Sequence, residues 1–79
     1  MNDQETCEEM KRLIEVALPS AKVQVTGGGG HFRIAVVSEL FEGKSMLNQH
    51  RLVYGAIAPL MEGHAPVVHA IDFLETRPV

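Results

Sequence analysis

Apolar residues recur at steps of three and four positions near the start of the chain, which predicts an amphipathic helix. The apolar positions of this repeat are Cys7, Met10, Leu13, Ile14, Ala17 and Leu18. Thr6 and Glu9 match a capping box, and Pro19 disfavours helical geometry at the residue before it. The pattern therefore predicts a helix from about residue 5 to about residue 18.

Two short apolar stretches on either side of a glycine run predict a β-hairpin. Residues 22–26 alternate polar and apolar side chains with Val23 and Val25 facing inward, and residues 32–37 form an apolar run that suits a central strand. Gly27–Gly30 separates the two stretches. Four glycines either supply several positive φ angles or let the backbone approach another group closely. A permissive hairpin loop is the simpler interpretation.

The second half of the chain predicts a short helix, a long helix and a third strand. Residues 39–42 have the length of a turn or two of helix. A longer helix then runs from Ser45, which caps it, to about Glu62, with Pro59 bending or ending its last turn. Residues 67–75 alternate as a strand. Almost thirty residues separate the second and third strands, which is the length that a parallel crossover requires.

The predicted order of elements is α-β-β-α-α-β, an α+β fold with helices packed on one face of a three-stranded mixed sheet. The 79 residues form one domain. The single cysteine, Cys7, excludes an internal disulfide framework and is expected to pack in the core. No apolar run reaches the length of a membrane span, and the start lacks a signal-peptide pattern. These features predict a cytoplasmic protein, or equally one of an organelle matrix.

The segment from Phe41 to Tyr54 combines apolar positions directed to the core with a polar, partly basic stretch at Asn48, Gln49, His50 and Arg51. Two interpretations stay open. Either Lys44, His50 and Arg51 form a face for a partner or a nucleic acid, or His50 and Arg51 hydrogen-bond the turn and cap the neighbouring helix.

Two phosphate-binding motifs are incomplete in this segment. Gly43-Lys44-Ser45 imitates the end of a nucleotide-binding loop, but Ser38 stands where the first glycine is required. The strand-helix-turn-helix-strand order is also the frame of the K-homology RNA-binding module, whose turn carries Gly-x-x-Gly. Here that turn has only Gly43, so the sequence does not support RNA binding by this route.

Four histidines, His31, His50, His64 and His69, supply nitrogen donors in a short chain. None has a zinc-type spacing with cysteines or with another histidine. No set of nucleophile, base and orienting group stands out, which argues against catalysis. From the residues alone, His69 is interpreted as a satisfied strand histidine and His31 as a hairpin-end residue.

Four blocks of sequence, in this order, resemble successive signatures of the BolA family. They are Gly-His-Phe-Arg-Ile-Ala-Val-Val-Ser at 30–38, Phe-Glu-Gly-Lys-Ser at 41–45, His-Arg-Leu-Val-Tyr at 50–54 and Val-His-Ala-Ile at 68–71. Together they cover most of the chain. The resemblance implies the class II KH-like α-β-β-α-α-β fold, which agrees with the order derived above from the residue pattern.

The resemblance also implies a function. It indicates a non-enzymatic partner of monothiol glutaredoxin, in a heterodimer that shares a [2Fe-2S] cluster with glutaredoxin and glutathione for iron-sulfur cluster assembly, trafficking or iron sensing. His69 matches the cluster-ligating histidine of the family. The second family ligand lies in the loop between the first two strands, where His31 is the nearest candidate. An imidazole in place of a thiolate raises the potential of such a cluster.

An alternative of a different class, also suggested by the family resemblance, is a DNA-binding transcriptional regulator. Arg33, Lys44, His50 and Arg51 would then contact duplex DNA around the helix-turn-helix. The formal charge of −3 predicts weak, strongly salt-dependent DNA binding. We therefore favour the cluster partner. The sequence predicts no membrane partner and leaves a weak homodimer open.

Overall fold

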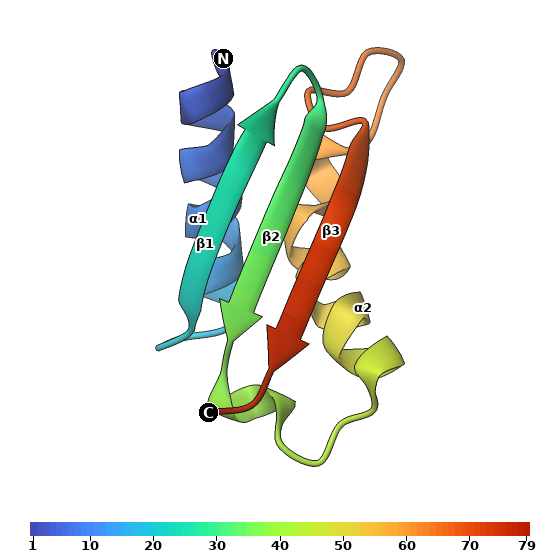
Figure 1. Cartoon of the computed structure of the whole chain (residues 1–79). Helices are drawn as coiled ribbons and strands as arrows, with labels where there is room; N and C mark the ends of the chain where they lie inside the picture. Colours follow the sequence, from blue (N-terminus) through green and yellow to red (C-terminus); the bar gives the residue numbers. More distant parts are fainter.

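A computed structural model describes the whole chain, residues 1–79, and places its helices behind a sheet of three strands (Figure 1). The elements are α1 (Asp3–Ala17), β1 (Lys22–Gly28), β2 (His31–Val37), the 3-10 helix η1 (Glu39–Phe41), α2 (Met46–Ile57), the 3-10 helix η2 (Ala58–Leu60) and β3 (Ala70–Arg77). The predicted α-β-β-α-α-β order is confirmed, with the predicted short helix present as η1.

The sheet has the order β1-β2-β3, so the most apolar strand is central. β1 and β2 pair antiparallel, and β2 and β3 pair parallel. The segment between β2 and β3 carries α2 across one face of the sheet, and α1 covers the same face beside it (Figure 1). The predicted mixed sheet with helices on one face is confirmed. Neither α1 nor α2 has the length and apolar character that crossing a lipid bilayer would require.

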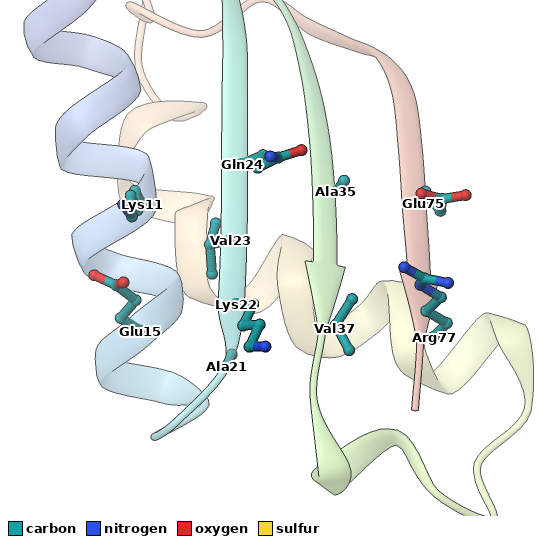
Figure 2. A pocket seen from close by; sticks show the side chains of 10 residues that line it. All are labelled: Lys11, Glu15, Ala21, Lys22, Val23, Gln24, Ala35, Val37, Glu75 and Arg77. Atoms are coloured by element: carbon teal, nitrogen blue, oxygen red, sulfur yellow. The ribbon is translucent and has the colours of Figure 1, made fainter. Parts of the chain in front are cut away.

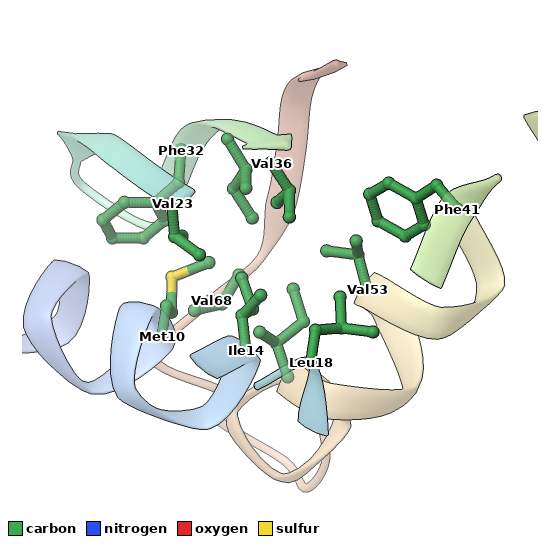
Figure 3. Close-up of a cluster of buried hydrophobic side chains, with 11 residues drawn as sticks. Met10, Ile14, Leu18, Val23, Phe32, Val36, Phe41, Val53 and Val68 are labelled. Atoms are coloured by element: carbon green, nitrogen blue, oxygen red, sulfur yellow. The ribbon is translucent and has the colours of Figure 1, made fainter. Parts of the chain in front are cut away.

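One hydrophobic core lies between the helices and the sheet (Figure 3). Its members are Met10, Ile14, Leu18, Val23, Phe32, Ile34, Val36, Phe41, Val53, Ile57 and Val68. The α1 members are four residues apart, which places them on one side of the helix. The β2 members alternate along the strand, and their neighbours therefore point to the open face.

A buried amide ties α2 to both of its neighbours. The side-chain amide of Gln49 donates hydrogen bonds to the backbone oxygens of Lys44 and Phe41, at 3.0 and 3.4 Å. Its Oε1 accepts one from the Thr76 hydroxyl of β3 at 2.8 Å. Gln49 is only 7% exposed, so its assignment to an exposed polar stretch was wrong. The partners are mostly backbone groups, which a residue pattern does not reveal.

The start of α1 differs from the prediction. Asn2 caps the helix and forms a capping box with Glu5: its Oδ1 accepts from the Glu5 N–H at 2.8 Å, and its own N–H donates to Glu5 Oε1 at 3.0 Å. Thr6 is buried inside the helix, where its hydroxyl donates to the Asn2 carbonyl. The box predicted at Thr6 and Glu9 was therefore placed one turn too late. Cys7, predicted in the core, is only half-buried at its margin.

The end of α2 and the start of β3 also differ from the prediction. α2 ends at Ile57, and Pro59 lies in η2. β3 begins at Ala70 and not at residue 67, because the N–H of Val68 bonds to the Leu60 carbonyl and not to a neighbouring strand. A register shift in the β2–β3 pairing interrupts the simple alternation that the sequence suggested for this strand.

Replacing Thr76 with valine should destabilise the fold, because it would leave the buried Oε1 of Gln49 without its donor. We expect a loss of about 1–3 kcal/mol in the free energy of unfolding, measured by urea denaturation. Thr26→Val is the matched control, since Thr26 is exposed on β1 and should change stability by no more than about 0.5 kcal/mol. Equal effects of the two substitutions would contradict the role given to this hydrogen bond.

Candidate functional site

The glycine run forms the tight end of the β1–β2 hairpin. Gly28 pairs with His31, which leaves Gly29 and Gly30 as a two-residue turn. Their φ angles are +64° and +84°. Two successive positive φ angles are what a type I′ hairpin turn requires, and glycine adopts them without steric cost. The predicted hairpin is confirmed, with a shorter connection than the four glycines suggested.

The same run lets two side chains approach the backbone closely. A Cβ atom on Gly30 would collide with the imidazole of His69, and one on Gly28 would collide with the carboxylate of Asp3. A Cβ on Gly29 would meet nothing within 4 Å. Both explanations that the sequence left open therefore apply, since the run supplies positive φ angles and also close approach.

His69 lies immediately before β3 and against the glycine turn. Its N–H donates to the Gly30 carbonyl at 2.8 Å, and the N–H of Ala70 donates to the same oxygen at 3.0 Å. The side chain of His69 is exposed, so its imidazole is accessible from outside. His69 is thus held by its backbone at the tip of the hairpin, and it is not the strand residue that the pattern alone suggested.

His31 is the first residue of β2, and its ring makes a hydrogen bond with Asp72 on the surface. Its Nδ1 lies 3.0 Å from Oδ1 of Asp72, and the two side chains are 59% and 52% exposed. His31 is also the β2 partner of Ala70, so the two predicted cluster ligands adjoin the same turn. No group of three or more histidine, cysteine, aspartate or glutamate side chains gathers anywhere in the chain to hold a metal ion.

The four residues predicted for a partner or nucleic-acid surface do not form one patch. Arg33 lies on the open face of the sheet, with its guanidinium carbon 4.7 Å from the centre of the Phe73 ring. Lys44 lies in the turn before α2, and Arg51 is exposed on that helix. The Nε2 atom of His50 is buried without a hydrogen-bond partner. The sheet separates Arg33 from the helical residues, and His50 does not offer this nitrogen to a ligand.

A hollow of about 630 Å³ extends from the α1 side of β1 over the open face of the sheet (Figure 2). Its charged lining residues are Lys11, Glu15, Lys22, Glu75 and Arg77. The charges are of both signs, and the lining contains no histidine or cysteine. This hollow therefore offers no imidazole or thiol donor and no uniformly basic surface for phosphate groups.

Two acidic residues at the turn were missed by the sequence analysis. Asp3 Oδ1 accepts a hydrogen bond from the Gly29 N–H at 3.2 Å, across 26 residues of chain. An acidic residue in the first turn of a helix is usually explained by the helix dipole alone. Asp72 falls at the register shift, where Phe32 pairs with Ile71 and the next β2 residue pairs with Phe73. Neither contact follows from local sequence.

The thiol of Cys7 also lies near the hairpin. Its Sγ is 3.9 Å from the Gly27 carbonyl oxygen. Burial raises the pKa of this thiol, and the nearby carboxylates of Asp3 and Glu8 raise it further. The thiolate form, which is the nucleophile and the metal ligand, is therefore disfavoured at neutral pH.

Comparisons with known proteins agree with this fold. A family model described as BolA-like protein matches residues 9–77. Acid stress protein IbaG of Escherichia coli (strain K12) is 37% identical over 71 residues, covering 89% of this chain and 81% of the relative. The solution structure of BolA1 from Mus musculus is 34% identical with a TM-score of 0.68, covering 90% of this chain and 64% of the other. Yeast Fra2 is 30% identical with a TM-score of 0.68, covering 99% and 80%.

Cys7 should react with iodoacetamide only at higher pH than an unstructured cysteine does, because its raised pKa keeps the thiol protonated. We expect the midpoint of the alkylation rate against pH to lie higher in the folded chain than in urea, as measured by mass spectrometry. Glu8→Gln removes one of the carboxylates and should lower the midpoint of the folded chain. Coincident midpoints for the folded and the unfolded chain would contradict this description of the thiol.

Proposed function

Because this chain belongs to the BolA-like protein family, with residues 9–77 matching the family model, we propose that it is a non-enzymatic partner of a monothiol glutaredoxin. The two proteins would share a [2Fe-2S] cluster for iron-sulfur cluster assembly, trafficking or iron sensing. The observation that carries the proposal is the exposed imidazole of His69, whose backbone N–H is held by the Gly30 carbonyl at the tip of the hairpin.

The donors of this chain suit a shared cluster and do not suit one that it holds alone. A [2Fe-2S] cluster takes four ligands, cysteine thiolates or, at one iron, histidines. His69 and His31 both adjoin the turn, but no three histidine, cysteine, aspartate or glutamate side chains gather there or elsewhere in the chain to hold a metal ion. Cys7 is directed to the Gly27 carbonyl with a raised pKa, so it is a poor source of thiolate. Glutaredoxin and glutathione would supply the missing thiolates.

The pairing of His31 with Asp72 supports His31 as the second ligand. Metal-binding histidines commonly direct one ring nitrogen to a carboxylate, which fixes the tautomer and the ring orientation. Here Nδ1 of His31 meets Asp72 at 3.0 Å, and Nε2 remains for the iron. In this role Asp72 orients the imidazole. Protons compete with iron for both imidazoles, because only the neutral form binds metal.

The alternative of a DNA-binding regulator has weaker support. Arg33 lies across the sheet from Lys44 and Arg51, and His50 has a buried Nε2. A formal charge of −3 also opposes binding to a polyanion. No contact in the structure favours this function over the cluster partner.

The direct test is to mix the chain with a monothiol glutaredoxin, iron, sulfide and glutathione, and to record the visible circular dichroism. We expect a [2Fe-2S] spectrum that differs from that of glutaredoxin alone and that is lost with His69→Ala. His64→Ala is the matched control, because His64 is also exposed but lies in the loop after η2. It should leave the spectrum unchanged.

His31→Ala should alter the spectrum by removing the second imidazole. A spectrum identical to that of glutaredoxin alone in every mixture would overturn the proposed function. Titration of duplex DNA at increasing salt would then test the alternative, because binding through phosphates weakens steeply with salt.

A further inference from the structure

We propose that the glycine turn is a seat for the imidazole of His69, and that Gly30 and Asp3 are positioning residues for it. The seat consists of Gly28, Gly29 and Gly30, with Asp3 against Gly28 and Gly29 and with His69 against Gly30. The inference rests on the proposed function to the extent that His69 is taken as an iron ligand. The seat itself is a property of the isolated chain.

The backbone of His69 is fixed to the turn by a shared acceptor. The Gly30 carbonyl receives the N–H groups of both His69 and Ala70, at 2.8 and 3.0 Å. These two hydrogen bonds join the residue before β3 to the tip of a hairpin that is far away in the sequence. These backbone hydrogen bonds alone therefore fix the position of the His69 Cα atom relative to the turn.

The side chain of His69 occupies the space that a Cβ on Gly30 would need. Both Cδ2 and Cγ of the ring lie within collision or tight-contact distance of such an atom. Gly30 is buried, although hairpin tips are normally exposed. Any side chain at position 30 would push the ring away. Glycine is thus required here for two separate reasons, its positive φ and the proximity of the imidazole.

Asp3 holds the turn from the side of α1. Its Oδ1 accepts from the Gly29 N–H at 3.2 Å, and its carboxylate fills the space beside Gly28. Asp3 is itself fixed in the first turn of α1, which the box of Asn2 and Glu5 caps. Glycine-rich turns lose much conformational entropy when they are ordered, so an external hydrogen bond at this point restricts the seat.

A seated imidazole matters for a ligand shared between two proteins. A side chain that already points in the binding direction loses less rotamer entropy when the complex forms. Residues that orient a ligand typically change metal affinity by about 10- to 100-fold. We therefore expect changes at Gly30 or Asp3 to alter cluster sharing even though neither residue binds iron.

The test compares Gly30→Ala with Gly29→Ala. Both substitutions place alanine at a positive φ and so impose a similar backbone strain, but only the one at position 30 adds a collision with the ring. In the isolated chain, the side-chain rotamer of His69, measured from its Hα–Hβ couplings, should be the same in the wild type and in Gly29→Ala. It should change in Gly30→Ala. With glutaredoxin, Gly30→Ala should assemble about 10-fold less shared cluster than Gly29→Ala.

A second pair of variants tests Asp3 without touching the turn. Asp3→Ala removes the acceptor for the Gly29 N–H, and Asp3→Asn retains an oxygen in that position. Amide exchange of Gly29 and His69 should accelerate in the alanine variant and return towards the wild-type rate in the asparagine variant. Cluster sharing should follow the same order. If Gly30→Ala fails to fold, the two Asp3 variants still test whether the turn positions His69.

An unchanged His69 rotamer in a folded Gly30→Ala variant, or equal cluster assembly by the two glycine variants, would contradict the proposed seat. So would Asp3→Ala and Asp3→Asn with identical exchange rates. If the wild type assembles no shared cluster, the proposed function fails instead. The rotamer and exchange measurements on the isolated chain then still decide whether the seat exists.

Discussion

The parallel pairing of β3 with β2 begins at the Gly30 carbonyl, and the other functional contacts depend on the register that it sets. From this point Ala70 pairs with His31, and a shift of one residue follows at Asp72. That shift coincides with the contact of Asp72 with the His31 ring. Further along the same strand, the register places Thr76 against the buried amide of Gln49. The register of the β2–β3 pairing therefore positions residues of both the candidate site and the core.

The division between core and site follows from this arrangement. The helices cover one face of the sheet, and the core between them is built from side chains of both the helices and the strands (Figure 3). The tip itself extends to the first turn of α1, where Asp3 meets Gly29. The exposed imidazoles of His31 and His69 thus lie at the end of the sheet that the hairpin tip forms. Such a site is suited to a ligand that two proteins hold together.

The sequence was sufficient for the order of elements, because helical and strand periodicities differ and the long connection before β3 requires a parallel crossover. It was insufficient where a residue's role depends on a distant group. Thr6 resembles a cap but lies on the buried side of α1, and Asn2 caps the helix instead. The sequence pattern suggests that Gln49 lies on a polar surface, yet it is buried and its partners are backbone oxygens and the Thr76 hydroxyl.

The sequence was also insufficient at the candidate site, where roles depend on contacts between distant segments. Family resemblance singled out His69, whereas residue pattern alone would have left it as an ordinary strand residue. The glycine run signalled either unusual φ angles or close approach, but not which side chains approach. Those contacts need the hairpin docked on α1 and β3 beside it, which brings Asp3 to Gly28 and His69 to Gly30. Long-range packing of this kind leaves no local signal in the sequence.

The central claim, that His69 supplies a nitrogen ligand to a shared cluster, is tested most directly by pulsed electron paramagnetic resonance on the reduced heterodimer. Only this chain would carry ¹⁵N-labelled histidine, and glutaredoxin and glutathione would stay unlabelled. We expect a ¹⁵N coupling of the strength of an iron-bound imidazole, lost when His69 is replaced with alanine. A cluster that forms with both proteins present but shows no such coupling would contradict the account.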